Sequence, residues 1–161
     1  MIQRIQSVFL GLIILLIATL CSISILHMVY VVPEGKTTEY VLNLFYFNTL
    51  ENGVLIESKM QILLILLASV VIGLSIYILM NYKNRLRQMT FTLLNQVAII
   101  ALAAAFGIQA YIYIPNFQSE KMLMPSVIGL TLFIFIIYLN IRVYFLIKKD
   151  EDLVRSADRI R

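Results

Sequence analysis

The chain has 161 residues, of which 61% are hydrophobic and only 14% are charged. A soluble domain is usually about half apolar and about a quarter charged, so this composition argues against an ordinary soluble protein and favours a surface that faces lipid. The net charge is +4, but no basic stretch is interleaved with exposed aromatic residues, which argues against nucleic-acid binding. We expect a single membrane domain over residues 1–161.

Four apolar runs are each long enough to cross the ~30 Å hydrocarbon core of a bilayer, which takes about 20 helical residues. They cover residues 8–32, 61–80, 91–114 and 124–147, and none contains Asp, Glu or Lys. Backbone groups in lipid must be hydrogen-bonded within their own segment, which favours helices. The sequence therefore predicts an all-α integral membrane protein, a four-transmembrane-helix bundle.

The first run could be a secretory signal peptide, but its apolar stretch is longer than the usual ~7–15 residues. We interpret it as a retained span that ends at Pro33. Cys21, the only cysteine, cannot form a disulfide within the chain and is expected to be an apolar filler. His27, the only histidine, lies near the outer end of this run, where an interfacial side chain is the simplest interpretation.

Residues 33–60 form the only long connection between apolar runs. Two β-prone stretches, EYVLNLFYF and VLIES, flank the Asn52-Gly53 pair, and an Asn-Gly pair between such stretches predicts a hairpin. We expect a small outer loop hairpin that caps the bundle. The alternative is an exposed edge that receives a partner.

The basic residues indicate the orientation of the chain. With the N-terminus inside, ten bases fall on the cytoplasmic side and three (Lys36, Lys59 and Lys121) on the outer side. Cytoplasmic loops carry an excess of Lys and Arg, so both termini are predicted to be cytoplasmic.

A few polar residues lie within the spans. Asn95 and Gln96 in the third run lie at about the same depth as Asn140 and Arg142 in the fourth. An ionisable residue inside a membrane is a candidate functional site, and a contact of Arg142 with Asn95 or Gln96 is one hypothesis. The simpler interpretation is structural: the amides join helices, and Arg142 extends to the interface.

The sequence contains no pattern of residues that indicates enzyme chemistry. Paired carboxylates, a metal-ligand cluster, a nucleophile triad and a Gly-rich phosphate loop are all missing from it. We therefore predict a protein that is not an enzyme and that has no cofactor or metal site.

The chain ends in KKDEDLVRSADRIR, where acids and bases nearly cancel. Read as a helix, Leu153, Ala157 and Ile160 share one face, and Glu151 precedes Arg155 at the favourable i, i+4 spacing. We predict a short C-terminal cytoplasmic amphipathic helix that packs on the basic inner loop or on another protein. A near-neutral tail is not a polybasic lipid anchor.

The stretches MIQRIQSV, KNRLRQ and IKKDEDLVRSADRIR resemble the domain-of-unknown-function 4293 family, short four-span membrane proteins of Bacteroidota. The resemblance covers the whole chain, although 84–88 reads NRLRQ where the family commonly has NRxLQ. It implies a multi-pass protein of the bacterial inner (cytoplasmic) membrane and brings no activity with it. It also highlights residues on the predicted cytoplasmic side, namely Arg4, Arg85, Asp150, Glu151, Arg155, Asp158 and Arg159. With Arg87 of the basic inner loop, they form one candidate partner-binding surface.

The leading functional hypothesis is a non-enzymatic accessory or scaffold protein whose partner, besides the lipid bilayer, is a membrane or cytoplasmic protein, with a homo-oligomer as a further candidate. The alternative is a small oligomeric transporter or channel for a polar or anionic solute, with Asn95, Gln96 and Arg142 along its path. A redox subunit that binds quinone or haem is a third option and depends on His27 and the aromatic residues. A water-filled cavity that reaches Arg142 would favour transport, and a closed bundle would favour the scaffold.

Overall fold

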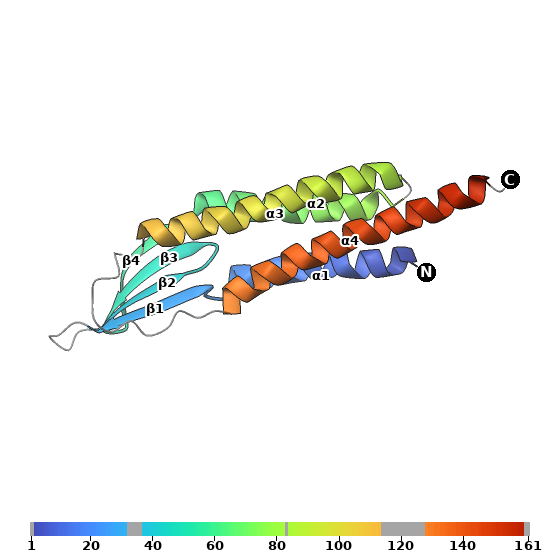
Figure 1. The fold of residues 1–161 in the computed structure, drawn as a ribbon. Coiled ribbons are helices and arrows are strands. Elements are labelled where there is room, and N and C mark those ends of the chain that lie inside the picture. Colours follow the sequence, from blue (N-terminus) through green and yellow to red (C-terminus); the bar gives the residue numbers. More distant parts are fainter. Residues whose placement is uncertain (1, 32–36, 83, 114–127, 160–161) are drawn as a thin grey trace.

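The computed structural model describes residues 2–31, 37–82, 84–113 and 128–159 (Figure 1). Within them the chain forms four helices and one four-stranded sheet. The helices are α1 (Ile2–Ser22), α2 (Ile62–Met80), α3 (Arg85–Tyr113) and α4 (Ile128–Arg159); the strands are β1 (Leu26–Val31), β2 (Thr37–Leu42), β3 (Tyr46–Glu51) and β4 (Val54–Met60).

The helices form an elongated bundle in which α2 packs on α3, α3 on α4, α4 on α1, and α1 on α2. Each presents one apolar stripe to the interior, as Leu10, Ile13, Ile17 and Leu20 do on α1, because residues three and four apart share a helix face. The opposite faces are also apolar and are exposed, as at Leu66 and Val97. All four helices are long and apolar enough to cross a membrane, so these outer faces are the surface that lipid would cover.

The expectation of an all-α bundle with a small hairpin is wrong, because the structure also contains a four-stranded antiparallel sheet in the order β1-β2-β3-β4. The first apolar run, expected as one span over 8–32, divides in two: α1 ends at Ser22, and β1 begins at Leu26. In β1, Leu26 pairs with Leu42 and Met28 pairs with Tyr40 of β2. A continuous apolar run hides this break, since a buried strand and a buried helix have the same composition.

A two-residue turn at Asn52-Gly53 connects β3 to β4. Glu51 and Val54, on either side of the turn, pair with each other. Asn52 has φ 48° and Gly53 has φ 78°, and a tight hairpin turn with two positive φ angles favours these two residue types. The Asn52 side-chain oxygen also accepts a hydrogen bond from the Thr37 backbone N–H at 3.0 Å, which joins the turn to the start of β2.

The sheet lies across the end of the bundle that is opposite to the start of α1 and the end of α4 (Figure 1). Leu42 and Phe47 of the sheet, and Leu44 in the connection between β2 and β3, contribute buried side chains to the apolar core. Gly129, in the first turn of α4, touches the chain just before β1: a Cβ built on Gly129 would lie 2.6 Å from Ile25 Cα. Only glycine lets the two backbones approach this closely.

Helix α4 extends without interruption to Arg159, so the predicted C-terminal helix is the end of the fourth span and not a separate element. Its 32 residues span about 48 Å at the helical rise of ~1.5 Å per residue, which exceeds the ~30 Å hydrocarbon core. The helix therefore projects past the bundle (Figure 1).

Candidate functional site

The most concentrated polar feature inside the bundle is an amide cluster shared by three helices. Its members are Ser75 of α2, Thr92, Asn95 and Gln96 of α3, and Asn140 of α4. Four of them are buried, and only Gln96 is partly exposed. The residues of α3 lie three and four positions apart, which places them on one helix face towards α2 and α4.

Asn140 is the centre of the amide cluster. Its side-chain N–H groups donate to Gln96 Oε1 at 2.8 Å and to the Thr92 carbonyl oxygen at 3.1 Å. Its Oδ1 accepts a hydrogen bond from the Asn95 amide at 3.1 Å. The same Asn95 amide donates to Ser75 Oγ at 3.1 Å, so Asn95 links α3 to both of its neighbours.

The two hydroxyl groups complete the amide cluster by bonding back to their own helices. Ser75 Oγ donates to the Val71 carbonyl oxygen at 2.9 Å, and Thr92 Oγ1 donates to the Gln88 carbonyl oxygen at 2.7 Å. Nearby, the Gln88 side chain donates to the carbonyl oxygen of Ile78 at 2.9 Å. That carbonyl belongs to the last turn of α2, where no helical N–H can reach it.

The amide cluster contains no titratable group, so it cannot act as a general acid or base or hold a net charge. Hydrogen bonds between polar side chains join helices in lipid, where apolar faces gain nothing from leaving lipid for one another. Among the described residues, Asn95 Oδ1 is buried without a hydrogen-bond partner. The amide cluster is therefore better suited to fixing the relative positions of the helices than to catalysis.

Arg142, which the sequence groups with these amides, takes no part in the hydrogen bonds of the amide cluster. Its side chain is exposed, whereas Asn140, two residues earlier, is 1% exposed. Two residues along a helix rotate the direction of the side chain by about 200°, so the two point to opposite sides of α4. The structure brings Asn95, Gln96 and Asn140 together and places Arg142 on the outer face.

A second polar contact joins α3 to the projecting part of α4. Arg85 Nε lies 3.2 Å from Asp150 Oδ2, and an Arg85 η-nitrogen donates to the Asp150 carbonyl oxygen at 3.0 Å. The side chains are 22% and 16% exposed, so this ion pair is less screened than a surface pair. One turn further, Arg155 Nε donates to Glu151 Oε1 at 2.9 Å.

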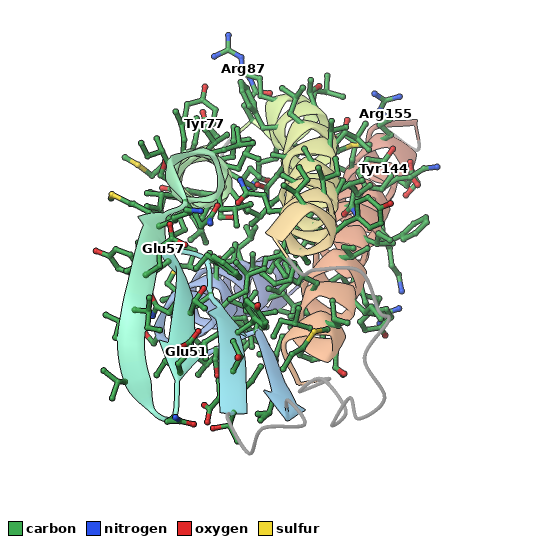
Figure 2. The ribbon with its side chains drawn as sticks, turned by 90° about the vertical axis from the view of Figure 1, so that its left-hand side faces the viewer. Glu51, Glu57, Tyr77, Arg87, Tyr144 and Arg155 are labelled. Carbon is green, nitrogen blue, oxygen red and sulfur yellow. The ribbon has the colours of Figure 1, made fainter. Side chains whose placement is uncertain are left out.

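Other residues of the predicted partner-binding surface are more dispersed. Arg87 is exposed on the α3 side of the molecule, and Arg155 lies apart from it on α4 (Figure 2). Arg4, Asp158 and Arg159 belong to α1 and α4, but their side chains lie outside the described ones. The charges gather at one end of the bundle without forming a single patch among the described side chains.

A shallow groove of about 370 Å³ lies near the Arg87 end of α2 and α3, lined by Tyr77, Leu86, Arg87, Thr90 and Phe91. The Tyr77 and Phe91 rings meet edge to face with centroids 4.4 Å apart. None of the lining residues belongs to the amide cluster, so this groove gives no access to it.

Metal and haem ligands do not converge in the described ranges, where no group of three His, Cys, Asp or Glu could hold a metal ion. His27 lies in β1 instead of a helix, and its Nε2 lies 3.2 Å from Glu39 Oε2 on β2. This contact is a cross-strand pair within the sheet.

Sequence reasoning missed Ser75, Gln88 and Thr92. Each is a common uncharged polar residue within or next to an apolar run, and only Gln88 belongs to a motif, as the last residue of KNRLRQ. For Gln88 and Thr92 the available signal was their spacing from Asn95, at seven and three residues on α3.

Together, the four helices that are long and apolar enough to cross a membrane and the four-stranded sheet at one end define a membrane protein that contains both helices and strands. The family model described as "Domain of unknown function (DUF4293)" matches residues 2–160. The chain therefore belongs to this family, which confirms the resemblance of its two ends and its central loop. No curated protein matches the chain.

Proposed function

We propose that the protein is a non-enzymatic scaffold or accessory protein of the bacterial inner membrane, with its interaction surface at the projecting end of α4. The observation that carries this proposal is the exposure of residues 152–156. This segment includes Leu153, which is 51% exposed, and Val154, which is 40% exposed. Aliphatic side chains on a helix that has left the bundle are the kind of surface that a second protein covers.

The direction of this helix is fixed, which favours a defined interface over a loose tail. Arg85 contacts both the side chain and the backbone carbonyl of Asp150, immediately before the exposed segment. A rigid helix loses less conformational entropy on binding than a disordered tail would. The partner expected from this surface is a protein with an apolar groove and polar rims, which takes an amphipathic helix.

The orientation in the membrane follows from the distribution of bases. Ten bases on one side against three on the other support cytoplasmic termini, because cytoplasmic loops carry an excess of Lys and Arg. The start of α1, the end of α4 and the connection between α2 and α3 lie at the same end of the molecule (Figure 1), which supports this assignment. The sheet would then lie on the outer side.

The geometry gives less support to a small oligomeric transporter or channel. Such a path would need Arg142 to face the same space as Asn95 and Gln96. Instead, Asn95 is fully buried among helices, and Arg142 is exposed on the other side of α4. An arginine in that position can extend to the headgroups without a functional role.

Site-specific photo-crosslinking in native membranes tests the scaffold proposal. A photoreactive residue at Val154 should yield a discrete protein adduct, while the same residue at Val97, which is 65% exposed on a membrane span, should label lipid. Leu153→Asp should remove the adduct at 154 by placing a charge in the apolar contact. Labelling of lipid or water alone at Val154 would contradict the proposal, and an adduct with a second copy of the chain would identify α4 as a homo-oligomeric contact.

A further inference from the structure

The outer edge of the sheet is unusually apolar and open. All seven residues of β4 are exposed, and four of them (Val54, Leu55, Ile56 and Met60) are large hydrophobic residues with more than half of their surface accessible. In the described part of the chain, β4 pairs only with β3. Proteins normally protect such an edge, because its backbone N–H and C=O groups recruit another strand.

The hydrogen bonds of the neighbouring residue show which backbone groups of β4 point outwards. The Gln61 N–H donates to the Phe45 carbonyl oxygen at 2.7 Å, so the backbone at Gln61 faces β3. Backbone groups alternate in direction along a strand. Lys59 and Glu57 therefore also face β3 with their backbones, and the N–H and C=O groups of Ser58 and Met60 face the open edge.

We propose that β4 pairs with β4 of a second copy of this chain, antiparallel and with Ser58 opposite Ser58 of the partner subunit. This inference is independent of the proposed scaffold function. In this register, Glu57 lies opposite Lys59 of the partner subunit, and by symmetry Lys59 lies opposite Glu57 of the partner subunit. The segment IESKM is thus complementary to its own reverse, with one apolar residue at each end.

The charges select this register over its neighbours. Hydrogen bonds can form only between residues whose backbone groups face the open edge. The register can therefore shift only by steps that keep Ser58 opposite such a residue of the partner subunit. A shift that brought Ser58 opposite Ile56 of the partner subunit would place the two Glu57 side chains against each other. The opposite shift would place the two Lys59 side chains together. Like charges directly opposite one another destabilise a sheet, whereas opposite charges stabilise it.

Within one chain, Lys59 Nζ already lies 3.1 Å from Glu57 Oε1, and both side chains remain about half exposed. Pairing of two copies would join two such ion pairs into a group of four alternating charges. The irregularity of pairing between Thr49 and Leu50 leaves Ile56 as an extra residue on β4, which limits the regular ladder to Glu57–Met60. Met60 of the partner subunit would then lie opposite Ile56, and Met60 shares the sheet face of Ser58, opposite to the face that carries the charges.

The placement of β4 leaves its edge accessible to a second copy of the chain. Two antiparallel strands at a sheet edge are related by a two-fold axis perpendicular to the sheet. Viewed along the helices, the strands lie side by side across the end of the bundle, with β4 and Glu57 at the periphery (Figure 2). The edge of β4 therefore faces away from the rest of the sheet, where a second copy related by such an axis would pair with it.

Disulfide trapping distinguishes this register. In a Cys21→Ser background, Ser58→Cys should crosslink two full-length copies in native membranes, because paired Cα atoms lie ~5.5 Å apart within disulfide reach. The matched control is Val54→Cys on the same strand. In this register, Val54 would lie opposite residue 62 of the partner subunit. The two Val54 residues would therefore be eight residues, or about 26 Å, apart along the strand. The control variant should stay uncrosslinked.

Charge reversal provides the second test. Glu57→Lys alone or Lys59→Glu alone should weaken dimerisation roughly tenfold, because each turns two attractive cross-strand pairs into repulsive ones. The double variant Glu57→Lys, Lys59→Glu should restore it. For the original sequence and for each charge variant, dimerisation is measured in lipid bilayers by single-molecule photobleaching of a fluorescently labelled chain. This measurement does not depend on an introduced cysteine.

Crosslinking at Ser58 with restoration by the double reversal would establish the pairing. Equal crosslinking at Val54 and Ser58, no response to the single reversals, or a monomer in bilayers at every density would overturn it. A monomer would mean that lipid alone covers the edge of β4.

Discussion

Asn95 on α3 and Asn140 on α4 are joined by a hydrogen bond of 3.1 Å between their side-chain amides, and neither is more than 1% exposed. The pair adds a directional contact between the two helices, in a medium where apolar faces gain nothing from leaving lipid for one another. Four experiments test this relationship and the other contacts that fix the bundle.

Replacing Asn140 by Leu should destabilise the protein, because the Asn95 amide and the Thr92 carbonyl would lose a buried partner. The expected cost is about 1–2 kcal/mol, between the mean for interhelical hydrogen bonds in membranes and the cost of an unsatisfied buried group. A double-mutant cycle with Asn95→Leu, measured by reversible unfolding in mixed micelles, should give a coupling energy above ~0.5 kcal/mol. Additive effects would show that the two amides act independently.

Arg142 should tolerate change. Because its side chain is exposed on the outer face of α4, Arg142→Lys should alter the free energy of unfolding by less than about 0.5 kcal/mol, as is usual for surface substitutions. The same cycle of Arg142 with Gln96 should show no coupling. A loss as large as that of Asn140→Leu would place Arg142 in the amide cluster and revive the transport hypothesis.

Gly129→Ala should be strongly destabilising, since the added methyl group would lie 2.6 Å from the backbone Cα of Ile25. The junction between α4 and the chain before β1 would have to separate. We expect a cost of about 2 kcal/mol or more, in the range of overpacked sites. Gly107→Ala, where nothing lies within 4 Å, is the matched control and should be neutral or slightly stabilising, because alanine favours a helix over glycine. Thermal unfolding in detergent measures both, and similar melting temperatures for the two variants would refute the close approach.

The contact between Arg85 and Asp150 should hold the projecting end of α4. Asp150→Asn removes the charge and keeps the shape, and we expect it to cost about 1 kcal/mol, since both side chains are mostly buried. A spin label at Val154 should become more mobile in that variant. Asp152→Asn changes a neighbouring exposed acid and serves as the control. Equal mobility changes in both variants would show that the order of α4 does not depend on the contact between Arg85 and Asp150.

The sequence by itself determined what depends on composition and on local order. Twenty apolar residues in succession predict a membrane-crossing helix from length alone, and the residues of α2, α3 and α4 that form spans follow from this rule. The Asn52-Gly53 turn depends on the φ angles of two residues and is visible in the sequence for the same reason. The equal depth of Asn95 and Asn140 could also be counted along the chain.

The tertiary structure decided what depends on partners distant in sequence. Residues 26–31 are as apolar as the helix before them, and they form a strand because residues 37–42 supply a register in which Leu26 meets Leu42. Arg142 and Asn140 are two residues apart, yet only the packing of α4 against α3 decides which of them faces the interior. Local sequence limits the secondary structure that a segment can adopt, whereas burial and strand pairing are properties of two segments together, and no single segment specifies them.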